Sequence, residues 1–335
     1  MKCNLFKLSL ISLLVWVPLA HTQDGKPPSA SQPNVEIIPR PKPGPATPDS
    51  VLDRRPDLRI DTTLVQIPVA VTEPMGRYVT GLDKENFKLL ENNVEQEVLS
   101  FSSEDAPMSV GVVFDTSGSM GPKIRRSQEA VRQFLKTANP EDEFFLVQFN
   151  DVAELTVPFT PETEDVQNRL TFAESKGRTA LLDAVYLAMH EMKKAKNPRR
   201  AILIISDGGD NSSRYTESEV KNAVRESDVQ IYAIGIYEGL GARGRTPEEA
   251  NGPGLLHDLA EQTGGRDFNV ENLAELPDVA AKIGLELRHL YMLGFSPKNK
   301  DRDGKFRRIQ VKLVKTAGLP PLTAKFKIGY YAPAQ

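Results

Sequence analysis

The chain has 335 residues, of which 39% are hydrophobic and 26% charged, and its formal net charge at pH 7 is −3. This length accommodates two domains, and the composition is typical of a globular protein. A mildly acidic chain with no Lys/Arg-rich patch is not expected to bind nucleic acid, and we exclude nucleic acid as a partner.

Residues 1–22 have the pattern of a secretory signal peptide. Lys2 and Lys7 form a basic start, and the apolar run LSLISLLVWVPLA follows at 8–20. A membrane-spanning helix needs about 20 apolar residues, so we predict cleavage at the end of this segment and no membrane span in the mature chain; an uncleaved N-terminal anchor is the alternative. Cys3 is the single cysteine and precedes the run, so the mature chain would lack disulfides. We therefore expect a secreted, periplasmic or cell-envelope protein of bacterial origin.

Residues 23–57 form the predicted linker. They contain nine prolines and few large apolar side chains. Such a segment cannot bury enough apolar surface to offset the conformational entropy that is lost on ordering. We therefore expect an extended, disordered spacer between the signal peptide and the folded part.

Two separate segments, 58–103 and 289–335, show the alternation of apolar and polar residues that is typical of β-strands. The first contains TTLVQIPVAVTE and FKLLENNVEQEVLSF, with Asn92-Asn93 as the expected turn, and the second contains YMLGFSP, FRRIQVKLV and LTAKFKIGYYAP. Each segment has too few strands to close a core alone. We predict that the two together form one smaller β-sandwich-like unit; two independent β extensions are the alternative.

The middle of the chain, 104–288, alternates apolar strands with amphipathic helices. Strands are expected at 109–115, 144–149, 201–207 and 229–237, with 152–159 as an edge partner. Helices are expected from Pro122, over 180–195, after the capping box of Thr216 and Glu219, and from Leu255 and Leu273. This order predicts an α/β fold with a doubly wound, mostly parallel sheet.

Oxygen-bearing side chains follow two of these strands at the point where each strand ends. The strand VGVVFD ends at Asp115, with Ser117 and Ser119 next, and AILIISD ends at Asp207. The carboxyl ends of parallel strands meet at one sheet edge, where ligands bind near the switch in strand order. Thr179, in a loop before a helix, completes an all-oxygen set of the kind that Mg²⁺ prefers. The alternative is a metal-free turn in which the serines cap the next helix, which leaves Thr179 and Asp207 unexplained.

The constellation resembles the metal-ion-dependent adhesion site of the von Willebrand factor A-type domain, which is a Rossmann-like fold. In that family the site consists of Asp-x-Ser-x-Ser, a threonine in a later loop and an aspartate that ends a later strand. The resemblance covers 109–288, and all five positions are matched in order by Asp115, Ser117, Ser119, Thr179 and Asp207. The flanks are similar to the bacterial exported proteins described as VWFA-related, which share the ending GYYAP.

The resemblance also implies how such a site works. The hydroxyls of Ser117 and Ser119, and in some cases that of Thr179, would contact the metal, whereas Asp115 and Asp207 would hold it largely through water. The ion is expected to be Mg²⁺, with Mn²⁺ and Ca²⁺ left open, and an Asp or Glu carboxylate of a protein partner would complete its octahedron. The implied function is an exported, metal-dependent protein-binding or adhesion module. The alternative is a structural subunit of a cell-envelope assembly in which the metal only stabilises the fold.

Other patterns in the chain give no support for catalysis or for a second site. GLGARG at 239–244 spells the glycine pattern of dinucleotide-binding loops, but no helix opens at the glycines. NKDRDG at 299–304 mimics the start of an EF-hand loop, but its twelfth position is Gln310, so an Asp-Gly hairpin turn is expected. The sequence contains no G-x-S-x-G nucleophile elbow. We therefore predict that the protein is not an enzyme and has no catalytic residues.

Overall fold

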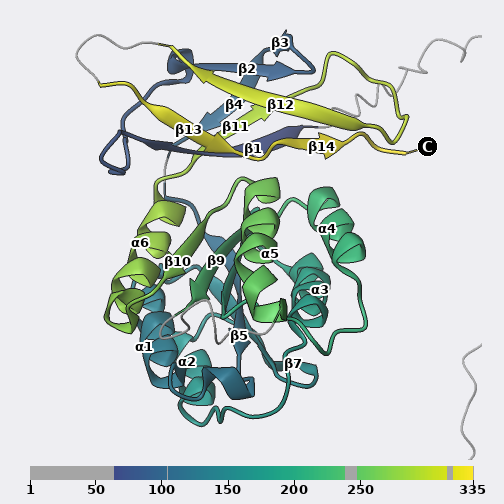
Figure 1. Ribbon diagram of the computed structural model, residues 1–335. Helices are drawn as coiled ribbons and strands as arrows, with labels where there is room; N and C mark the ends of the chain where they lie inside the picture. The colour runs from purple at the N-terminus through teal and green to yellow at the C-terminus, as the bar shows by residue number, and fades with distance from the viewer. Residues whose placement is uncertain (1–63, 104, 238–246, 315–319, 335) are drawn as a thin grey trace, which may run out of the picture. The chain divides into compact units, whose positions relative to one another are not determined.

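The computed structural model describes residues 64–103, 105–237, 247–314 and 320–334 (Figure 1). All of them belong to one unit of the chain, Ile60–Gln335. The predicted signal peptide, the predicted linker and the GLGARG motif lie outside these residues. None of the helices in this part of the chain combines the length and the apolar character that a membrane crossing requires.

The middle of the chain folds around a six-stranded sheet, and we call this part the central domain. The strand order is β10-β9-β8-β5-β6-β7. Neighbouring strands run parallel except for β7, which is antiparallel to β6 at the edge of the sheet. The strands are β5 (Met108–Asp115), β6 (Glu143–Phe149), β7 (Ala153–Thr160), β8 (Arg199–Ser206), β9 (Gln230–Ile236) and β10 (Asp267–Val270).

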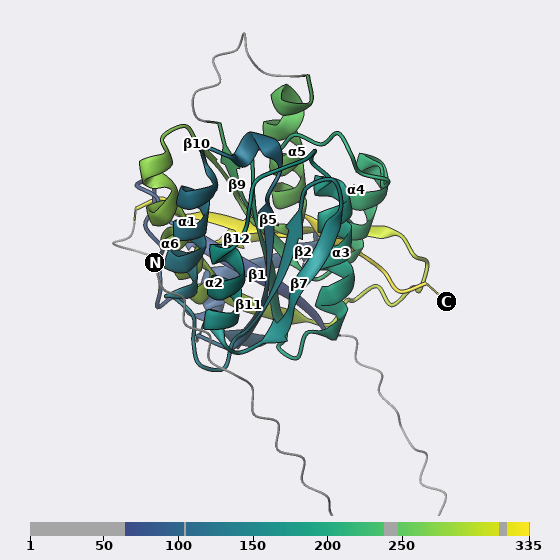
Figure 2. The same cartoon turned by 90° about the horizontal axis from the view of Figure 1, so that it is seen from below.

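Helices cover both faces of this sheet (Figure 2). One hydrophobic core lies under α1 (Ile124–Leu135), α2 (Thr163–Thr171) and α6 (Leu276–Arg288). The other lies under α3 (Leu181–Glu191), α4 (Glu217–Glu226) and α5 (Pro247–Thr263). Because β5, β6 and β9 are covered on both sides, every residue in them is buried, which explains their continuous apolar sequences. The predicted doubly wound α/β fold is confirmed.

The two flanks of the chain contribute strands to two further sheets, which we call the flanking sheets. Their strand orders are β13-β1-β11-β4 and β14-β12-β2-β3. The strands from the first flank are β1 (Val65–Thr72), β2 (Phe87–Glu91), β3 (Val94–Gln96) and β4 (Val98–Ser102). Those from the second are β11 (Tyr291–Phe295), β12 (Phe306–Leu313), β13 (Thr323–Phe326) and β14 (Gly329–Tyr331).

Each flanking sheet contains strands from both flanks, so the flanks do not form separate extensions. In one sheet β1 pairs with β11, and in the other β2 pairs with β12. A single hydrophobic core joins both sheets, with Val69, Leu89, Leu293 and Ile309 among its buried side chains. The arrangement is the predicted β-sandwich-like unit built from both flanks.

The predicted turn at Asn92-Asn93 is confirmed, since both residues have positive φ (47° and 67°). Two other details of the flanking sheets differ from the sequence expectation. The segment LTAKFKIGYYAP forms two strands, β13 and β14, which belong to different sheets. The segment 299–304 is not a hairpin turn, because β11 and β12 also lie in different sheets and the segment runs between them. Its backbone folds around Arg307, whose guanidinium donates to the carbonyl oxygens of Asn299 and Asp301.

Candidate metal centre

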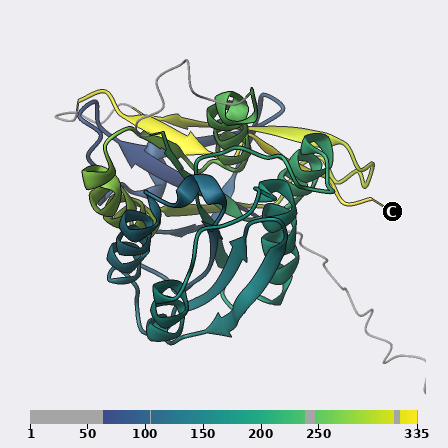
Figure 3. The same ribbon diagram turned by 60° about the horizontal axis from the view of Figure 1, so that its bottom comes forward.

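The five residues predicted to hold a metal lie on three loops at the carboxyl edge of the central sheet. This edge is at the bottom of Figure 1 and is turned forward in Figure 3. β5 ends at Asp115, and its neighbour β8 ends at Ser206, directly before Asp207. The chain leaves β5 for β6 on one side and returns to β8 on the other, so the strand order switches at these two strands. In doubly wound sheets this is the position at which ligands bind.

Asp115 is fully buried and accepts two hydrogen bonds. Its Oδ1 accepts from the backbone N–H of Ser117 at 2.8 Å, and its Oδ2 accepts from the Ser206 hydroxyl at 2.6 Å. Burial raises the pKa of Asp115 to about 7, and the nearby charge of Asp207 adds to this rise, although the hydrogen bonds oppose it. A carboxylate in these surroundings is unfavourable without a cation close by.

Asp207 is also buried, and its two oxygens have different surroundings. Oδ2 accepts from the ammonium of Lys123 at 3.0 Å, and the Lys123 side chain is only 4% exposed. Oδ1 is buried and has no hydrogen-bond partner among the described residues. An unpartnered carboxylate oxygen in a protein interior is costly unless a cation or an ordered water satisfies it. The residues therefore fit a bound cation at this edge.

The two serines lie in a tight turn directly after Asp115. Their hydroxyl oxygens are 3.1 Å apart, and the turn contains a short 3₁₀ helix, Gly118–Met120. The neighbouring loop fixes this turn, since Gly118 N–H donates to the Gly177 carbonyl at 3.0 Å. Gly177 has φ 77°, and a Cβ there would lie 2.2 Å from the Asp151 carboxylate. A larger residue at this position would therefore push the Asp151 side chain away from the loop.

Thr179 lies further along that neighbouring loop and is 5% exposed. Its backbone N–H donates to the Asn211 side chain at 3.0 Å, and its carbonyl accepts from the N–H groups of Asn211 and Ser212. The loop of Thr179 is thus hydrogen-bonded to the serine turn on one side and to the segment after Asp207 on the other. The structure therefore brings together the three loops that carry the predicted set.

Several residues that shape this site are not apparent from the sequence pattern. Ser206 supports Asp115, and Lys123 neutralises Asp207. Asp210 and Asp183 are two further acidic residues near the site, and their carboxylates accept hydrogen bonds from the backbone. Asp210 accepts from the N–H of Leu182, and Asp183 accepts from the backbone of the segment after β8, so both hold that segment against the start of α3. Ser206 has a visible signal, a hydroxyl just before a strand-ending aspartate, whereas Lys123 has none.

The donor set decides which chemistry this edge can support. Within the described ranges, no three His, Cys, Asp or Glu side chains gather in a way that could hold a metal ion. The predicted set instead has two carboxylates and three hydroxyls, and such oxygen donors suit a hard divalent cation that keeps part of its water.

Comparison with known proteins places this edge in a family. The family model for the von Willebrand factor type A domain matches residues 110–209, which include all five predicted residues. The central domain is a von Willebrand factor type A domain. The family match therefore extends from within β5 to just beyond β8 of the A-type domain.

Individual relatives share only part of their length with this chain. An uncharacterised protein from Borreliella burgdorferi is 25% identical over 194 residues, which are 50% of this chain and 55% of that protein. The inter-alpha-trypsin inhibitor heavy chain 4 of Mus musculus is 30% identical over 150 residues, 40% of this chain and 16% of that one. This chain therefore spans about half of the first relative and a much smaller part of the second.

Among solved structures, proximal thread matrix protein 1 from the mussel byssus, with a zinc-occupied MIDAS motif, has a TM-score of 0.48 and 17% identity. The match covers 60% of this chain and 50% of that one.

Proposed function

We propose that the A-type domain is a metal-dependent protein-binding module that captures an Asp or Glu carboxylate of a partner. Ser117, Ser119 and Thr179 would hold a divalent cation, Mg²⁺ by preference, together with the two aspartates. The bound ion would act as an electrophilic anchor for an incoming carboxylate. The hydroxyls leave its charge largely uncompensated, while Ser206 and Lys123 keep the aspartates in place.

The observation that carries this proposal is the charge balance of the three buried ionisable groups. Asp115 and Asp207 bring two negative charges when ionised, and Lys123 brings one positive charge, so together they leave a charge of −1. A divalent cation changes this to +1. A site with one excess positive charge at a solvent-facing edge favours an anionic ligand, and one carboxylate would neutralise it.

We further propose the cellular setting and the domain limits. The chain would be exported with residues 1–22 as signal peptide and 23–57 as spacer. Residues 58–103 and 289–335 would form the β-sandwich-like unit, and 104–288 the A-type domain. The basic, apolar and proline-rich order of the first 57 residues supports export to the bacterial cell envelope or beyond it.

A structural subunit in which the metal only stabilises the fold is the second candidate. The raised pKa of Asp115 supports it, because a cation would remove the cost of the buried charge without any partner. The two candidates differ in one respect. Only the binding module needs a free position on the ion for a partner.

The first test is calorimetric titration of the full chain with Mg²⁺. We expect Asp115→Ala to abolish binding and Ser119→Ala to weaken it about tenfold, since water can replace part of a lost hydroxyl. Glu174→Gln, a change of an exposed acidic residue on the Thr179 loop, is the matched control and should bind as the parent does. A folded Asp115→Ala variant with parental affinity would refute the site.

The second test separates the two candidates. A bait of the full chain is incubated with envelope extract with Mg²⁺ or with EDTA, and a glutamate-containing peptide is added as competitor. The binding module predicts capture that EDTA abolishes, that the peptide reduces and that Thr179→Ala weakens more than it weakens Mg²⁺ binding. Capture that persists in EDTA, while Mg²⁺ still raises the melting temperature, would favour the structural subunit.

A further inference from the structure

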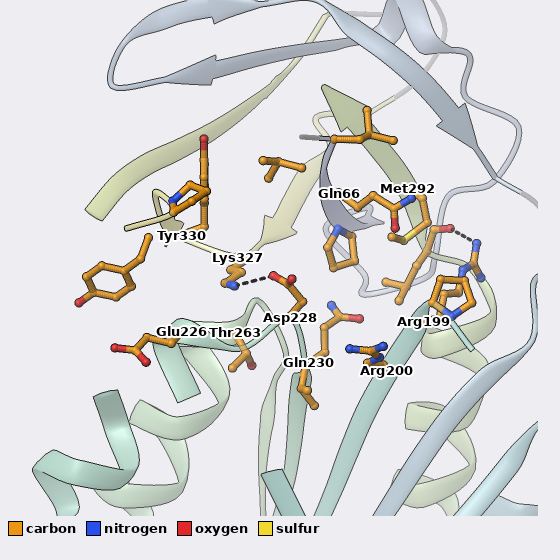
Figure 4. Close-up of a pocket in the computed structure, with 18 residues that line it drawn as sticks. Gln66, Arg199, Arg200, Glu226, Asp228, Gln230, Thr263, Met292, Lys327 and Tyr330 are labelled. Carbon is orange, nitrogen blue, oxygen red and sulfur yellow. Dashed lines mark hydrogen bonds and ion pairs between the residues drawn. The ribbon is translucent and has the colours of Figure 1, made fainter. Parts of the chain in front are cut away.

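A cavity lies at the opposite end of the central sheet from the metal edge. It has a volume of about 410 Å³ and is bounded by the amino ends of β8 and β9 on one side (Figure 4). The start of β1, β11 and the segment around β14 bound it on the other side. Arg200 and Asp207 are seven residues apart, which places the cavity about 23 Å from the metal edge at about 3.3 Å per residue. A cavity of this size suits a small molecule or a chain terminus.

The floor of the cavity presents hydrogen-bond donors that have no acceptor. The Nε2 of Gln230 and the Nε of Arg200 are buried and unpartnered within the part of the chain that the structure describes. Gln230 is only 5% exposed, and Figure 4 shows its amide reaching into the cavity from β9. Buried donors without acceptors destabilise a fold, so their presence at one wall of a cavity indicates a missing acceptor.

The charges around the cavity indicate that this acceptor is a single anion. Three basic side chains line it, against two acidic ones, so one positive charge is left over. Lys327 is already engaged by Asp228 and by the Ser227 carbonyl. The exposed Glu226 lies at the same cavity, and its charge would repel a multiply charged ligand such as a phosphate dianion. Arg200, whose Nε has no acceptor among the described residues, is therefore the basic group of the cavity that can take up an anion.

The remaining wall of the cavity is apolar. Leu64, Val65 and Met292 line it from the side of the flanking sheets, and Leu290 and Val229 add further apolar surface. Leu64 is 43% exposed, although it is a large hydrophobic residue. A ligand with a charged head at the floor and an apolar body along this wall would satisfy the donors and cover Leu64 together.

We propose that this cavity binds a small amphipathic monocarboxylate, with its carboxylate on Arg200 and Gln230 and its apolar part along Leu64, Val65 and Met292. The same chemistry has two sources, a free fatty acid or the C-terminal carboxylate of a peptide with an apolar last residue. This site is separate from the metal centre, so its occupancy does not depend on a divalent cation or on the function proposed above.

The test uses the full chain in EDTA and two pairs of probes. Sodium octanoate is compared with octanamide, and the tripeptide acetyl-Ala-Ala-Leu is compared with its C-terminal amide, by calorimetry and by thermal melting. The variants are Arg200→Gln and Gln230→Leu. Arg308→Gln, which changes an exposed arginine on β12, is the control.

We expect octanoate, the tripeptide or both to bind the parent and the Arg308→Gln control. The corresponding amide should bind at least tenfold more weakly. Arg200→Gln and Gln230→Leu should each reduce affinity about tenfold, which corresponds to about 1.4 kcal/mol. Gln230→Leu removes an unpartnered buried donor, so it should also raise the melting temperature without ligand. Binding of octanoate alone identifies a free acid, and binding of the tripeptide alone identifies a chain terminus.

Three results would overturn the proposal: no binding of either carboxylate to the parent at millimolar concentration, equal binding of carboxylate and amide, or parental affinity in both folded variants. Because all measurements are made in EDTA, a failure of the metal site cannot produce or hide any of them.

Discussion

Lys123 is the residue at the metal edge whose role is least expected, because it is a lysine buried beside a proposed metal ligand. Its ammonium holds one oxygen of Asp207 and leaves the other unpartnered among the described residues. It therefore does two things at once. It compensates a buried charge in the absence of metal, and it lowers the negative charge that a cation would experience.

We predict that Lys123→Met destabilises the metal-free protein by about 3 kcal/mol, because Asp207 then remains buried without a partner. The same variant should bind Mg²⁺ about tenfold more tightly, since a competing positive charge is removed while the apolar stem is kept. Urea denaturation with and without Mg²⁺, and calorimetry, measure the two effects. Lys136→Met, on an exposed lysine after α1, should change neither. Unchanged affinity in folded Lys123→Met would show that Lys123 does not act on the cation.

At this scale the sequence predicts the strand-ending aspartates and the serines that follow them, because a residue's position at a strand end depends only on local pattern. It does not predict the partner of Asp207. A lysine at the start of an amphipathic helix is normally solvated, and Lys123 is buried only because the start of α1 meets Asp207 after the end of β8. The proposed anion cavity was missed for the same reason, since Arg200 and Gln230 become neighbours only through the pairing of β8 with β9.

Among the elements, β5 is an inner strand of the central sheet with a very close packing contact. It lies between β6 and β8, and its residue Gly111 is covered by the ring of Phe145. A Cβ at Gly111 would lie 2.2 Å from that ring, far inside van der Waals contact. The sequence needs glycine here because an aromatic ring occupies the space of a side chain.

Gly111→Ala should therefore destabilise the protein by about 3 kcal/mol, as overpacking of a rigid core does. Gly254→Ala is the matched control, since a Cβ there meets nothing within 4 Å and the residue lies in α5. In that helix alanine should be neutral or stabilising by about 0.5 kcal/mol. Urea denaturation measures the free energy of unfolding of both variants. Equal stability of Gly111→Ala and the parent would contradict the packing argument.

The contact between α5 and β10 should respond to pH through His257. Its Nδ1 lies 2.9 Å from Asp267 Oδ1, and this hydrogen bond is the main cause that raises the pKa of His257, with the charges of nearby carboxylates adding to it. Because the folded pKa is above the unfolded value, the added stability is fully present below pH of about 6.5 and is lost as pH rises through the folded pKa. The side chain is 52% exposed, so this contribution is only a few tenths of a kcal/mol after screening.

Nuclear magnetic resonance titration of His257 measures this directly. The pKa should lie above that of a free histidine and fall in Asp267→Asn. The stability lost in Asp267→Asn should be larger at pH 5.5 than at pH 8.5. A His257 pKa that does not respond to Asp267→Asn would exclude the pair.

The elements that the sequence predicts well are those with a strong pattern. The fully apolar strands β5 and β9 and the capping box at Thr216 are examples. Helix α2 was not predicted, because TEDVQNRLT is polar and buries only Val166 and Leu170. The segment 299–304 was misassigned since an Asp-Gly pair is compatible with a hairpin, whereas the separation of β11 and β12 into two sheets depends on strand pairing with distant residues.

For the whole molecule, one buried carboxylate connects the flanking sheets with the central domain. Glu286, on α6, has a side chain with no exposed surface. It accepts hydrogen bonds from the hydroxyl of Tyr78, just after β1, and from that of Tyr232 in β9, at 2.6 and 3.2 Å. Arg266 compensates its charge at 3.1 Å. The two parts should therefore unfold together.

We predict that Glu286→Gln lowers the free energy of unfolding by about 3 kcal/mol, since the amide leaves Arg266 without its carboxylate and brings donors against donors. Tyr78→Phe removes only the link from the flank and should cost about 1 kcal/mol. Urea denaturation followed by circular dichroism measures both. Parental stability of Glu286→Gln would mean that this network contributes nothing to the joint between the two parts.

The pairing of β1 with β11 has a mechanical consequence. Val65 lies opposite Phe295, and Val69 lies opposite Tyr291, the residue at which β11 leaves the central domain. Suppose a partner is held at the metal edge while the chain is restrained at the residue that enters β1. Val65 and Tyr291 lie at opposite ends of the paired stretch, so the component of this tension along the strands pulls them in opposite directions, which is a shearing load. All five paired positions resist it at once instead of opening one after another. If the A-type domain captures a partner as proposed, this pairing of the two flanks would let the chain bear force between a tether and that partner.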